Sequence, residues 1–581
     1  MATRPSNRYY KKKRKKKRDT TIKPVKPAFI ILPVIAAAIL AAVLIIVLRP
    51  EDKTARTRYL ASSSRGVPYY YFNEDENRLI RSSQSIPRGT QVLDLDRQYT
   101  ENGIDYAVIE LNGNLYYINQ SSLVEDPHDI IQETQVWVRT SCTVYENETG
   151  CEIASAAKKG DCLEVLDYDS MNKDGSINKY KISFTDVTGA DVTGWVYGKY
   201  LVPDEEEALA VNNEIYEIHK NRVYSAMELY GGLPTTLDWY PVEKPAFPDN
   251  TLLEKASAMY LTIDSIQKID DYIELAKNSG VNAMVIDIKD NLVAYPCDEI
   301  KDICPNAYKT AFYGSASQYK EAVKKCQDAG LYCIGRIVAF KDSVFAGDHP
   351  ESCIISSVSS QTWPSAYSRE CWYYNIRLAI AAARLCGFNE IQFDYVRFPE
   401  AAYNMSISGD TDFRNTYDEE KAEAIQNFCY YACDALYEEG VYVSIDVFGE
   451  CANAYVTAYG QYYPAISLVV DAISGMPYPD HYGREEDTWS NPYPIMNDWG
   501  FKADLRSSET PNPAVNRVWV AAYDVPFWDP YVICDSGYIA SQVQGLVDAG
   551  LTGGFITWNA ESNFSKYQLI ADAWSRSYDP S

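Results

Sequence analysis

Apolar and polar residues follow two patterns along the chain, and the pattern changes near residue 250. From residue 69 to about residue 204, short stretches of alternating apolar and polar residues are separated by Gly, Asn and Asp. This alternation predicts antiparallel strands. From residue 258 onward, a helix-like stretch ending in Gly precedes a short apolar run, and this happens five times. Each Gly can take the left-handed conformation that ends a helix, so this region predicts helices alternating with buried strands.

The second region predicts an eight-stranded barrel. Five strands follow the helix-ending glycines, at residues 283–287, 333–338, 391–394, 443–447 and 554–558, and three more fill the gaps at 259–263, 469–475 and 517–523. Eight apolar strands alternating with helices over roughly 320 residues favour a (β/α)8, TIM-type barrel. An open doubly wound sheet is the alternative. It is disfavoured because no Gly-rich phosphate-binding turn follows the first strand and no edge strand is evident.

The first region contains a loose internal repeat. Residues 88–94, 106–110, 116–118 and 123–124 form one copy, and residues 159–167, 180–182, 194–198 and 201–202 form the other. Each copy has a Gly-led turn, a strand, a hairpin and an aromatic strand that closes on Leu-Val, which predicts two small all-β barrels. The closing Gly-Trp-Val-Tyr of the second copy resembles bacterial SH3-like domains, and the first copy is a degenerate version. The resemblance implies contact with the cell wall or with a peptide; spacers without a ligand are the alternative.

The N-terminal segment predicts a membrane anchor. Eight consecutive basic residues, 11–18, precede an uncharged apolar run from Ala28 to Leu48, which as a helix would span about 30 Å, the thickness of a bilayer core. The basic side of a membrane span stays in the cytoplasm, so we expect everything after Arg49 to lie outside the cell. A cleavable signal peptide is the alternative, but its apolar region is normally only about 7–15 residues long.

These patterns divide the chain into seven predicted segments. They are a basic cytoplasmic tail (1–27), a transmembrane helix (28–48), a linker (49–68), a degenerate SH3-like domain (69–126), an SH3-like domain (133–204), an acidic and Pro-rich connector (205–250) and the (β/α)8 domain (251–579).

Charge excludes one class of partner. The net charge is −26, although residues 1–58 hold 16 of the 54 basic residues and only 3 of the 80 acidic ones. A body this acidic repels nucleic acid, so we expect no nucleic-acid partner. The four His residues are dispersed along the chain, which argues against His-rich zinc sites and His-dependent nucleophile triads.

Fourteen Cys residues in an exported protein raise the question of disulfides. Cys142 with Cys151, and Cys297 with Cys304, are close enough in sequence to close small loops. Cys429 and Cys433 are four residues apart in a predicted helix, which suits a metal pair, but the chain contains no CxxC motif. Many of these residues are equally explained as small buried apolar side chains. We expect no cofactor and no metal ligands, and the acidic stretch 410–412 leaves a structural Ca²⁺ open.

Polar residues at the strand ends form the candidate site, because the active site of such a barrel lies at the C-terminal ends of its strands. Hydrolysis of a glycosidic bond needs two carboxyl groups, about 5–5.5 Å apart for retention or about 6.5–9.5 Å for inversion. One stays ionised and the other has a raised pKa. Neighbouring strands 4 and 5 supply such a pair, Asp394 and Asp446. Aromatic residues near the strand ends can stack on sugar rings: Tyr395, Phe448, Tyr478, Tyr482, Trp528 and Trp558.

Five of these strand-end segments resemble a known family. They are residues 285–290, 336–342, 390–399, 446–449 and 476–482, of which 390–399 is the most diagnostic. They are similar to the motifs of a bacterial family of glycoside hydrolase-like barrels, a domain of unknown function related distantly to amylase-like glycosidases. The likeness spans about residues 258–573. It implies a (β/α)8 fold and hydrolysis of a polysaccharide.

The resemblance also implies roles for single residues. In amylase-like barrels the strand-4 Asp is the nucleophile, which points to Asp394, while strand 5 gives the acid and strand 7 a stabilising Asp, which points to Asp446 and Asp524. Their acid is usually Glu, so Glu450 is the substitute. The remaining strand-end residues are expected to bind substrate: Asp287, Lys289, Arg336, Lys341, Arg397, Tyr395, Tyr478, His481, Trp558, Asn559 and Glu561.

The sequence therefore predicts a membrane-anchored, outward-facing glycosidase that acts on a cell-wall or exported polysaccharide. A noncatalytic glycan-binding scaffold that keeps the barrel is the first alternative, and two carboxyl groups facing one cleft would decide against it. A wall peptidase is the second, with Cys451 as nucleophile and His481 as its nearest His in sequence.

Overall fold

The computed structural model describes residues 55–210, 213–222, 230–359 and 362–580. The predicted tail and transmembrane helix, residues 1–48, lie outside these ranges. Among the residues inside them, no helix is long and apolar enough to cross a membrane. The described chain divides into two compact units: the first comprises residues 55–61, 67–86 and 90–130, and the second comprises residues 62–66, 87–89 and the chain from Ile131 on.

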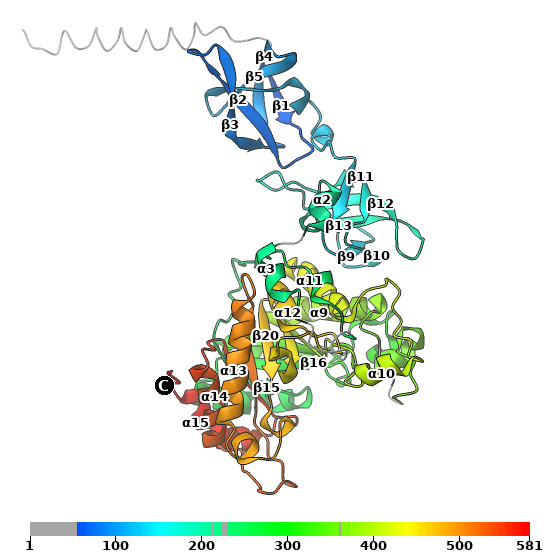
Figure 1. The fold of residues 1–581 in the computed structure, drawn as a ribbon. Coiled ribbons are helices and arrows are strands. Elements are labelled where there is room, and N and C mark those ends of the chain that lie inside the picture. The colour runs from blue at the N-terminus through cyan, green and yellow to red at the C-terminus, as the bar shows by residue number, and fades with distance from the viewer. Residues whose placement is uncertain (1–54, 211–212, 223–229, 360–361, 581) are drawn as a thin grey trace, which may run out of the picture. The chain divides into compact units, whose positions relative to one another are not determined.

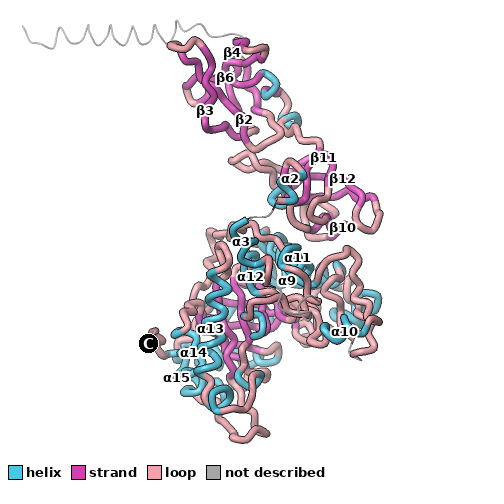
Figure 2. The backbone as a smooth tube through the Cα atoms, in the orientation of Figure 1, coloured by secondary structure: helices cyan, strands magenta, loops and turns pink. Residues whose placement is uncertain are grey.

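The two predicted all-β regions are seven-stranded antiparallel sheets (Figures 1 and 2). The first comprises β1 (Arg56–Leu60), β2 (Gly66–Asn73), β3 (Arg78–Pro87), β4 (Gln91–Glu101), β5 (Ile104–Leu111), β6 (Asn114–Asn119) and β7 (Leu123–Val124). The second comprises β8 (Gln135–Val138), β9 (Cys142–Tyr145), β10 (Ile153–Ala157), β11 (Cys162–Tyr168), β12 (Lys179–Thr185), β13 (Asp191–Tyr197) and β14 (Leu201–Val202).

The internal repeat is confirmed at the level of strand order. The first sheet runs β3-β2-β6-β5-β4-β1-β7, and the second runs β10-β9-β13-β12-β11-β8-β14, which is the same order shifted by seven strands. One segment differs from the prediction, because β1 lies in residues 49–68, which were expected to be a linker. It is a strand because its backbone pairs with both β4 and β7.

The third sheet confirms the predicted barrel, since eight parallel strands close on themselves in chain order and β15 pairs with β22. The strands are β15 (Ala256–Leu261), β16 (Ala283–Lys289), β17 (Tyr332–Val338), β18 (Glu390–Asp394), β19 (Tyr442–Phe448), β20 (Ala472–Met476), β21 (Val515–Ala521) and β22 (Gly554–Trp558). The five glycines predicted to end helices all have positive φ angles. Gly387, at φ 70°, ends the helix that precedes β18 in this way.

Helices surround the barrel and connect its strands (Figure 1). They are α5 (Ile269–Ser279), α6 (Pro305–Lys309), α7 (Ser317–Asp328), α8 (Ser343–Asp348), α9 (Arg369–Cys386), α10 (Ala402–Ser408), α11 (Lys421–Tyr437), α12 (Tyr463–Val469), α13 (Tyr493–Ser508), α14 (Ser536–Asp548) and α15 (Phe564–Ser575), while α2 (Glu205–Leu209) and α3 (Asn213–His219) lie in the connector. Apolar side chains fill both the strand–helix interface and the barrel interior, where Tyr260, Val285 and Trp519 meet.

The second small sheet shares a core with the barrel. Asp434, on the buried side of α11, accepts hydrogen bonds from the hydroxyls of Tyr145 (3.3 Å) and Tyr200 (2.9 Å), and pairs with the Lys199 ammonium at 2.5 Å. The Tyr431 hydroxyl of α11 donates in return to the Cys151 carbonyl at 2.6 Å. The aromatic face of this sheet therefore packs on a barrel helix.

No disulfide forms. All fourteen Cys residues lie within the described ranges and all have free thiols, thirteen of them buried. The two disulfides considered from spacing are thus absent, and these side chains serve as small apolar residues of the core. Among the described residues, no group of His, Cys, Asp and Glu is placed to hold a metal ion.

Candidate active site

A cavity of about 610 Å³ opens at the C-terminal ends of the barrel strands. Each of the eight strands, or the loop that directly follows it, contributes at least one side chain to the wall, because neighbouring parallel strands end at the same level. The volume lies within the range of about 300–1,000 Å³ typical of ligand sites. This is where a (β/α)8 enzyme carries its catalytic groups.

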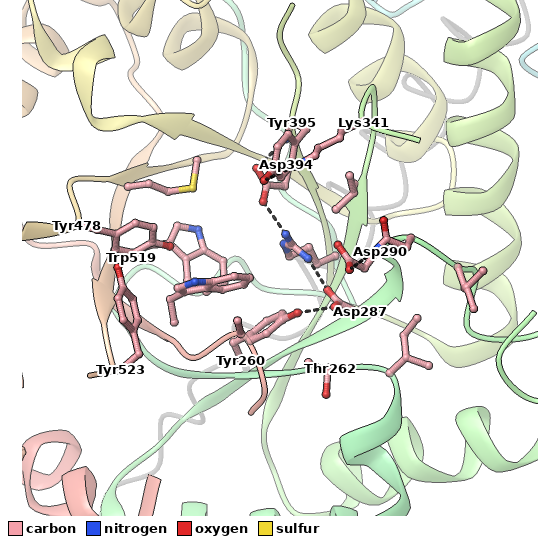
Figure 3. Close-up of a pocket in the computed structure, with 18 of the residues that line it drawn as sticks. Tyr260, Thr262, Asp287, Asp290, Lys341, Asp394, Tyr395, Tyr478, Trp519 and Tyr523 are labelled. Atoms are coloured by element: carbon pink, nitrogen blue, oxygen red, sulfur yellow. Dashed lines mark hydrogen bonds and ion pairs between the residues drawn. The ribbon is translucent and has the colours of Figure 1, made fainter. Parts of the chain in front are cut away.

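One arginine organises the acidic side of the cavity by binding both Asp287 and Asp394, the two carboxylates labelled there in Figure 3. The two terminal nitrogens of Arg336 donate to different carboxylates, Nη1 to Asp287 at 2.7 Å and Nη2 to Asp394 at 2.6 Å. Its Nε lies 4.0 Å from Oδ2 of a third carboxyl group, Asp446. Because both hydrogen-bonded oxygens touch one rigid guanidinium, they cannot be more than about 8 Å apart.

Arg336 faces three buried carboxyl groups, and burial raises the pKa of two of them. Burial raises the pKa of Asp287 to about 6, and Arg336 and the Tyr260 hydroxyl, 2.5 Å away, counteract part of that rise. Burial and the neighbouring Asp394 raise the pKa of Asp446 well above its ordinary value. A raised pKa brings proton donation by a carboxyl group closer to neutral pH, as acid catalysis requires.

Asp394 is held by a strained turn. The backbone N–H of Tyr395 donates to Asp394 Oδ1 at 2.6 Å, and Tyr395 itself has φ 56°, in the left-handed region. A bulky residue in that region costs on the order of 1–3 kcal/mol, and such strain concentrates at functional sites. The turn fixes the Asp394 carboxylate between a backbone donor and Arg336.

Asp446 lies beside Asp394 but below the cavity. The β18–β19 register pairs Phe393 with Ile445, which places the two following Asp residues level with each other. Asp446 Oδ1 accepts from Trp519 Nε1 at 2.7 Å and from Gln392 Nε2 at 2.8 Å. Asp446 is fully buried and is absent from the cavity wall. The indole of Trp519 separates it from the space that a substrate would occupy.

Aromatic rings line the side of the cavity opposite Asp287 and Asp290 (Figure 3). Tyr478 meets Tyr523 with ring centroids 6.1 Å apart, and Trp519 meets Trp558 at 5.6 Å, both edge to face. Flat apolar rings facing carboxylates across a cavity suit a pyranose, which has apolar faces and polar edges.

The structure brings nine of the predicted residues together in this wall: Asp287, Arg336, Lys341, Asp394, Tyr395, Phe448, Tyr478, His481 and Trp558. Two others point elsewhere. Lys289 forms a buried ion pair with Asp342 at 2.5 Å, and Arg397 is paired with Glu400 at 2.7 Å. Four more line neighbouring hollows, Glu450 in one and Asp524, Asn559 and Glu561 in another.

Sequence reasoning missed several wall residues, chiefly Tyr260, Trp519 and Tyr523. A signal existed for the last two, since alternation along the predicted strand 517–523 places residues 519 and 523 on one face. The thiol considered for the alternative wall peptidase, that of Cys451, is poorly suited to act as a nucleophile. Burial raises the pKa of Cys451, and its thiol contacts Gln461 at 3.2 Å rather than a His.

Comparison with known families decides the kind of protein. Residues 258–564, more than half of the chain, match the family described as "Putative glycosyl hydrolase domain". The chain belongs to this family. The protein is therefore a glycosyl hydrolase of the (β/α)8 type, as the sequence motifs implied. No curated protein sequence matches the chain.

Solved structures resemble parts of the protein. A hypothetical protein from Ruminiclostridium thermocellum is 32% identical, over 32% of this chain and 97% of its own, with a TM-score of 0.28. The PgaB (BpsB) glycoside hydrolase domain from Bordetella bronchiseptica is 13% identical, over 56% and 99%, with a TM-score of 0.43. The spore cortex-lytic enzyme SleL from Bacillus megaterium is 12% identical, over 62% and 84%, with a TM-score of 0.34.

Proposed function

We propose that this protein is a membrane-anchored glycosidase that faces outward and cleaves a cell-wall or exported polysaccharide. The observation that carries the catalytic part is the Asp287–Arg336–Asp394 cluster in the wall of the barrel cavity. The basic run 11–18 followed by the apolar run 28–48 supports the membrane address. The resemblance of residues 133–204 to SH3-like domains supports contact with the wall.

In the proposed reaction, the ionised Asp394 carboxylate attacks the anomeric carbon while Asp287 transfers its proton to the glycosidic oxygen, and the bond between carbon and oxygen breaks. Asp287, now ionised, then takes a proton from water, and the resulting hydroxide displaces Asp394 from the sugar. Atoms and charges balance, and Asp287 is protonated again at the end. The first half forms a glycosyl-enzyme, so the anomeric configuration is retained.

Asp287 is preferred to Asp446 and Glu450 as the proton donor for two reasons. It lies in the wall, whereas Asp446 is covered by Trp519 and Glu450 faces another hollow. Its pKa of about 6 also suits a group that must hold a proton near neutral pH and release it during the reaction. Arg336 donates directly to Asp394 and so holds the attacking carboxylate in place.

A polysaccharide panel tests the proposal. The full-length protein in detergent is incubated with wall and exported polysaccharides, beside Asp394→Asn, Asp287→Asn, Asp446→Asn and the control Asp328→Asn, whose exposed carboxylate lies at the end of α7, away from the cavity. We expect released sugar from the parent and the control, and a loss of at least about 10³-fold in Asp394→Asn.

Each outcome has a meaning. Release that survives both Asp394→Asn and Asp287→Asn contradicts the assignment. A loss in Asp446→Asn with full activity in Asp287→Asn gives the acid role to Asp446. Binding of polysaccharide by the parent without release of sugar from any substrate would instead support a noncatalytic scaffold.

A further inference from the structure

The cavity continues into two neighbouring hollows. A hollow of about 580 Å³ adjoins it at the ends of β21 and β22 and shares Tyr523, Trp558 and Ala560 with its wall. A second, of about 530 Å³, adjoins it at the ends of β19 and β20 and shares Phe448, Met476 and His481. Because the walls are shared, the catalytic cluster lies in the middle of a longer depression rather than at the bottom of a closed pocket.

The loop after β21, which Tyr531 ties to the edge of the β21–β22 hollow, carries three exposed apolar side chains that we call the rim. In the loop after β21, Phe527, Ile533 and Tyr531 are 80%, 55% and 52% exposed. The Tyr531 hydroxyl donates to Asp524 at 3.2 Å, and Asp524 lines the hollow, which ties this loop to its edge. Leaving three large apolar side chains in water within one short loop is unfavourable unless a ligand covers them.

Two hydrogen bonds hold the floor under this rim. Asp524 accepts from the Lys566 ammonium at 2.7 Å and from the Cys534 backbone at 2.7 Å. The hollow thus has fixed polar groups in its wall and an exposed apolar loop tied to its edge, a combination that suits sugar residues.

The charge of the cavity and the two hollows limits which ligands can bind. In the cavity and in each hollow the acidic side chains outnumber the basic ones: Asp264, Asp287, Asp290 and Asp394 against Arg336 and Lys341; Glu400, Glu450 and Asp498 against Lys502; Asp524 and Glu561 against Lys566. A depression that is acidic along its length repels an anionic chain.

Building on the proposed function, we propose that the depression binds the interior of a polysaccharide chain without anionic groups. Successive sugar residues occupy the cavity and the β21–β22 hollow, where Phe527 and Tyr531 stack on them. The enzyme therefore cleaves within chains rather than at their ends, and its affinity rises with chain length.

Binding of defined oligosaccharides tests this inference without requiring cleavage. The full-length protein carrying Asp394→Asn is titrated calorimetrically with oligomers of two, four, six and eight residues from three uncharged series: β-1,4-linked N-acetylglucosamine, β-1,4-linked glucose and α-1,4-linked glucose. A carboxymethylated hexamer from the series that binds most tightly serves as the anionic counterpart of the uncharged hexamer. Phe527→Ala and Tyr531→Ala are added singly, and Phe501→Ala is the matched control, because Phe501 is 64% exposed on α13 and lines none of the hollows described above.

We expect at least one series to bind more tightly from two to six residues. Each rim variant should weaken hexamer binding about 2- to 10-fold, the range for loss of one aromatic contact, and change dimer binding less than twofold. Tyr531→Phe should bind like the parent, because the ring and not the hydroxyl is required. The carboxymethylated hexamer should bind more weakly.

Four results would each overturn the inference. They are equal losses of affinity for dimers and hexamers in the rim variants, a loss in Phe501→Ala as large as in the rim variants, tighter binding of the anionic hexamer than of the uncharged one, and no binding in any series. None of these results bears on cleavage, which the polysaccharide panel measures with the parent protein. Chain-end release by a parent that binds long oligomers tightly would overturn interior cleavage alone.

Discussion

Arg336→Gln tests whether one cation holds the acidic cluster together. The guanidinium is 2% exposed, and its two hydrogen-bonded partners, Asp287 and Asp394, are 2% and 7% exposed at their side chains. Gln is shorter and uncharged, so it leaves two buried carboxyl groups without a counterion. The barrel must then either keep buried negative charge or take up protons.

The magnitude follows from the burial. Removal of one partner from a buried ion pair costs about 3–5 kcal/mol, because the remaining charge is stranded in the interior. Arg336 serves two carboxylates directly, so we expect the upper part of that range at pH 7.5. At pH 5 the deficit should be smaller, because losing the cation raises the pKa of Asp287 further and its protonation removes part of the stranded charge.

Thermal and urea midpoints of the full-length protein at pH 5 and pH 7.5 measure the effect, followed by tryptophan fluorescence. The control is Arg517→Gln, since Arg517 is also fully buried in the barrel but pairs with a single carboxylate, Glu390, at 2.6 Å. Both variants should melt earlier at pH 7.5, Arg336→Gln by more, and only Arg336→Gln should alter the pH profile of sugar release. A melting point of Arg336→Gln within about 1 °C of the parent at pH 7.5, or a deficit that grows at pH 5, would refute the reasoning.

Three further predictions concern single side chains. Folding raises the pKa of Asp287 from 3.8 to about 6, so the contribution of this group to stability is full below about pH 4 and falls by about 3 kcal/mol as the pH rises through 6. Asp287→Asn removes this titration and should therefore narrow the difference in melting temperature between pH 4.5 and pH 7.5. An unchanged difference would contradict the assigned pKa. Glu450→Gln should keep kcat within about threefold, since Glu450 faces a neighbouring hollow; a hundredfold loss would restore it as a catalytic candidate. Asp434→Ala leaves two buried tyrosine hydroxyls, those of Tyr145 and Tyr200, without an acceptor. The free energy of unfolding should therefore fall by about 2–4 kcal/mol, which a lower urea midpoint would show. An unchanged midpoint would show that the contact adds no stability.

The fold was largely predictable because its signals are local. Gly280, Gly387 and Gly440 end helices directly before buried strands, and periodicity alone reveals that alternation. Strand ends were less certain. Val469, expected to begin strand 6, is the last residue of α12, and β20 begins at Ala472. An apolar run of this length suits either element, so only tertiary packing decides.

The candidate site was predictable up to the direction of its side chains. Asp287 and Lys289 are two residues apart and would share a face in a regular strand, but the register with β17 shifts between them, and Lys289 pairs with Asp342 instead of lining the cavity. Arg397 diverges for a related reason, because the chain turns at the left-handed Tyr395. Neither irregularity has a sequence signal of its own.

The sequence also did not indicate which strand-end carboxyl groups reach the cavity and which lie buried beneath it. Asp394 and Asp446 end neighbouring strands at the same level, and nothing local distinguishes them. The difference comes from Trp519, some seventy residues further along, whose indole covers one carboxyl group and leaves the other in the wall. Because of this long-range packing, Asp394 lines the cavity whereas Asp446 lies buried beneath Trp519.

The contact between α11 and the second small sheet has a practical consequence for anyone trimming the protein. A cut at residue 205 or 251, where the sequence suggests independent parts, would remove the tyrosines and the lysine that cover Asp434. The truncated barrel would expose the unpaired Asp434 carboxylate and an apolar aromatic surface, which would promote aggregation. Shortened versions for crystals or assays should therefore begin ahead of residue 131 and retain that sheet as part of the catalytic body.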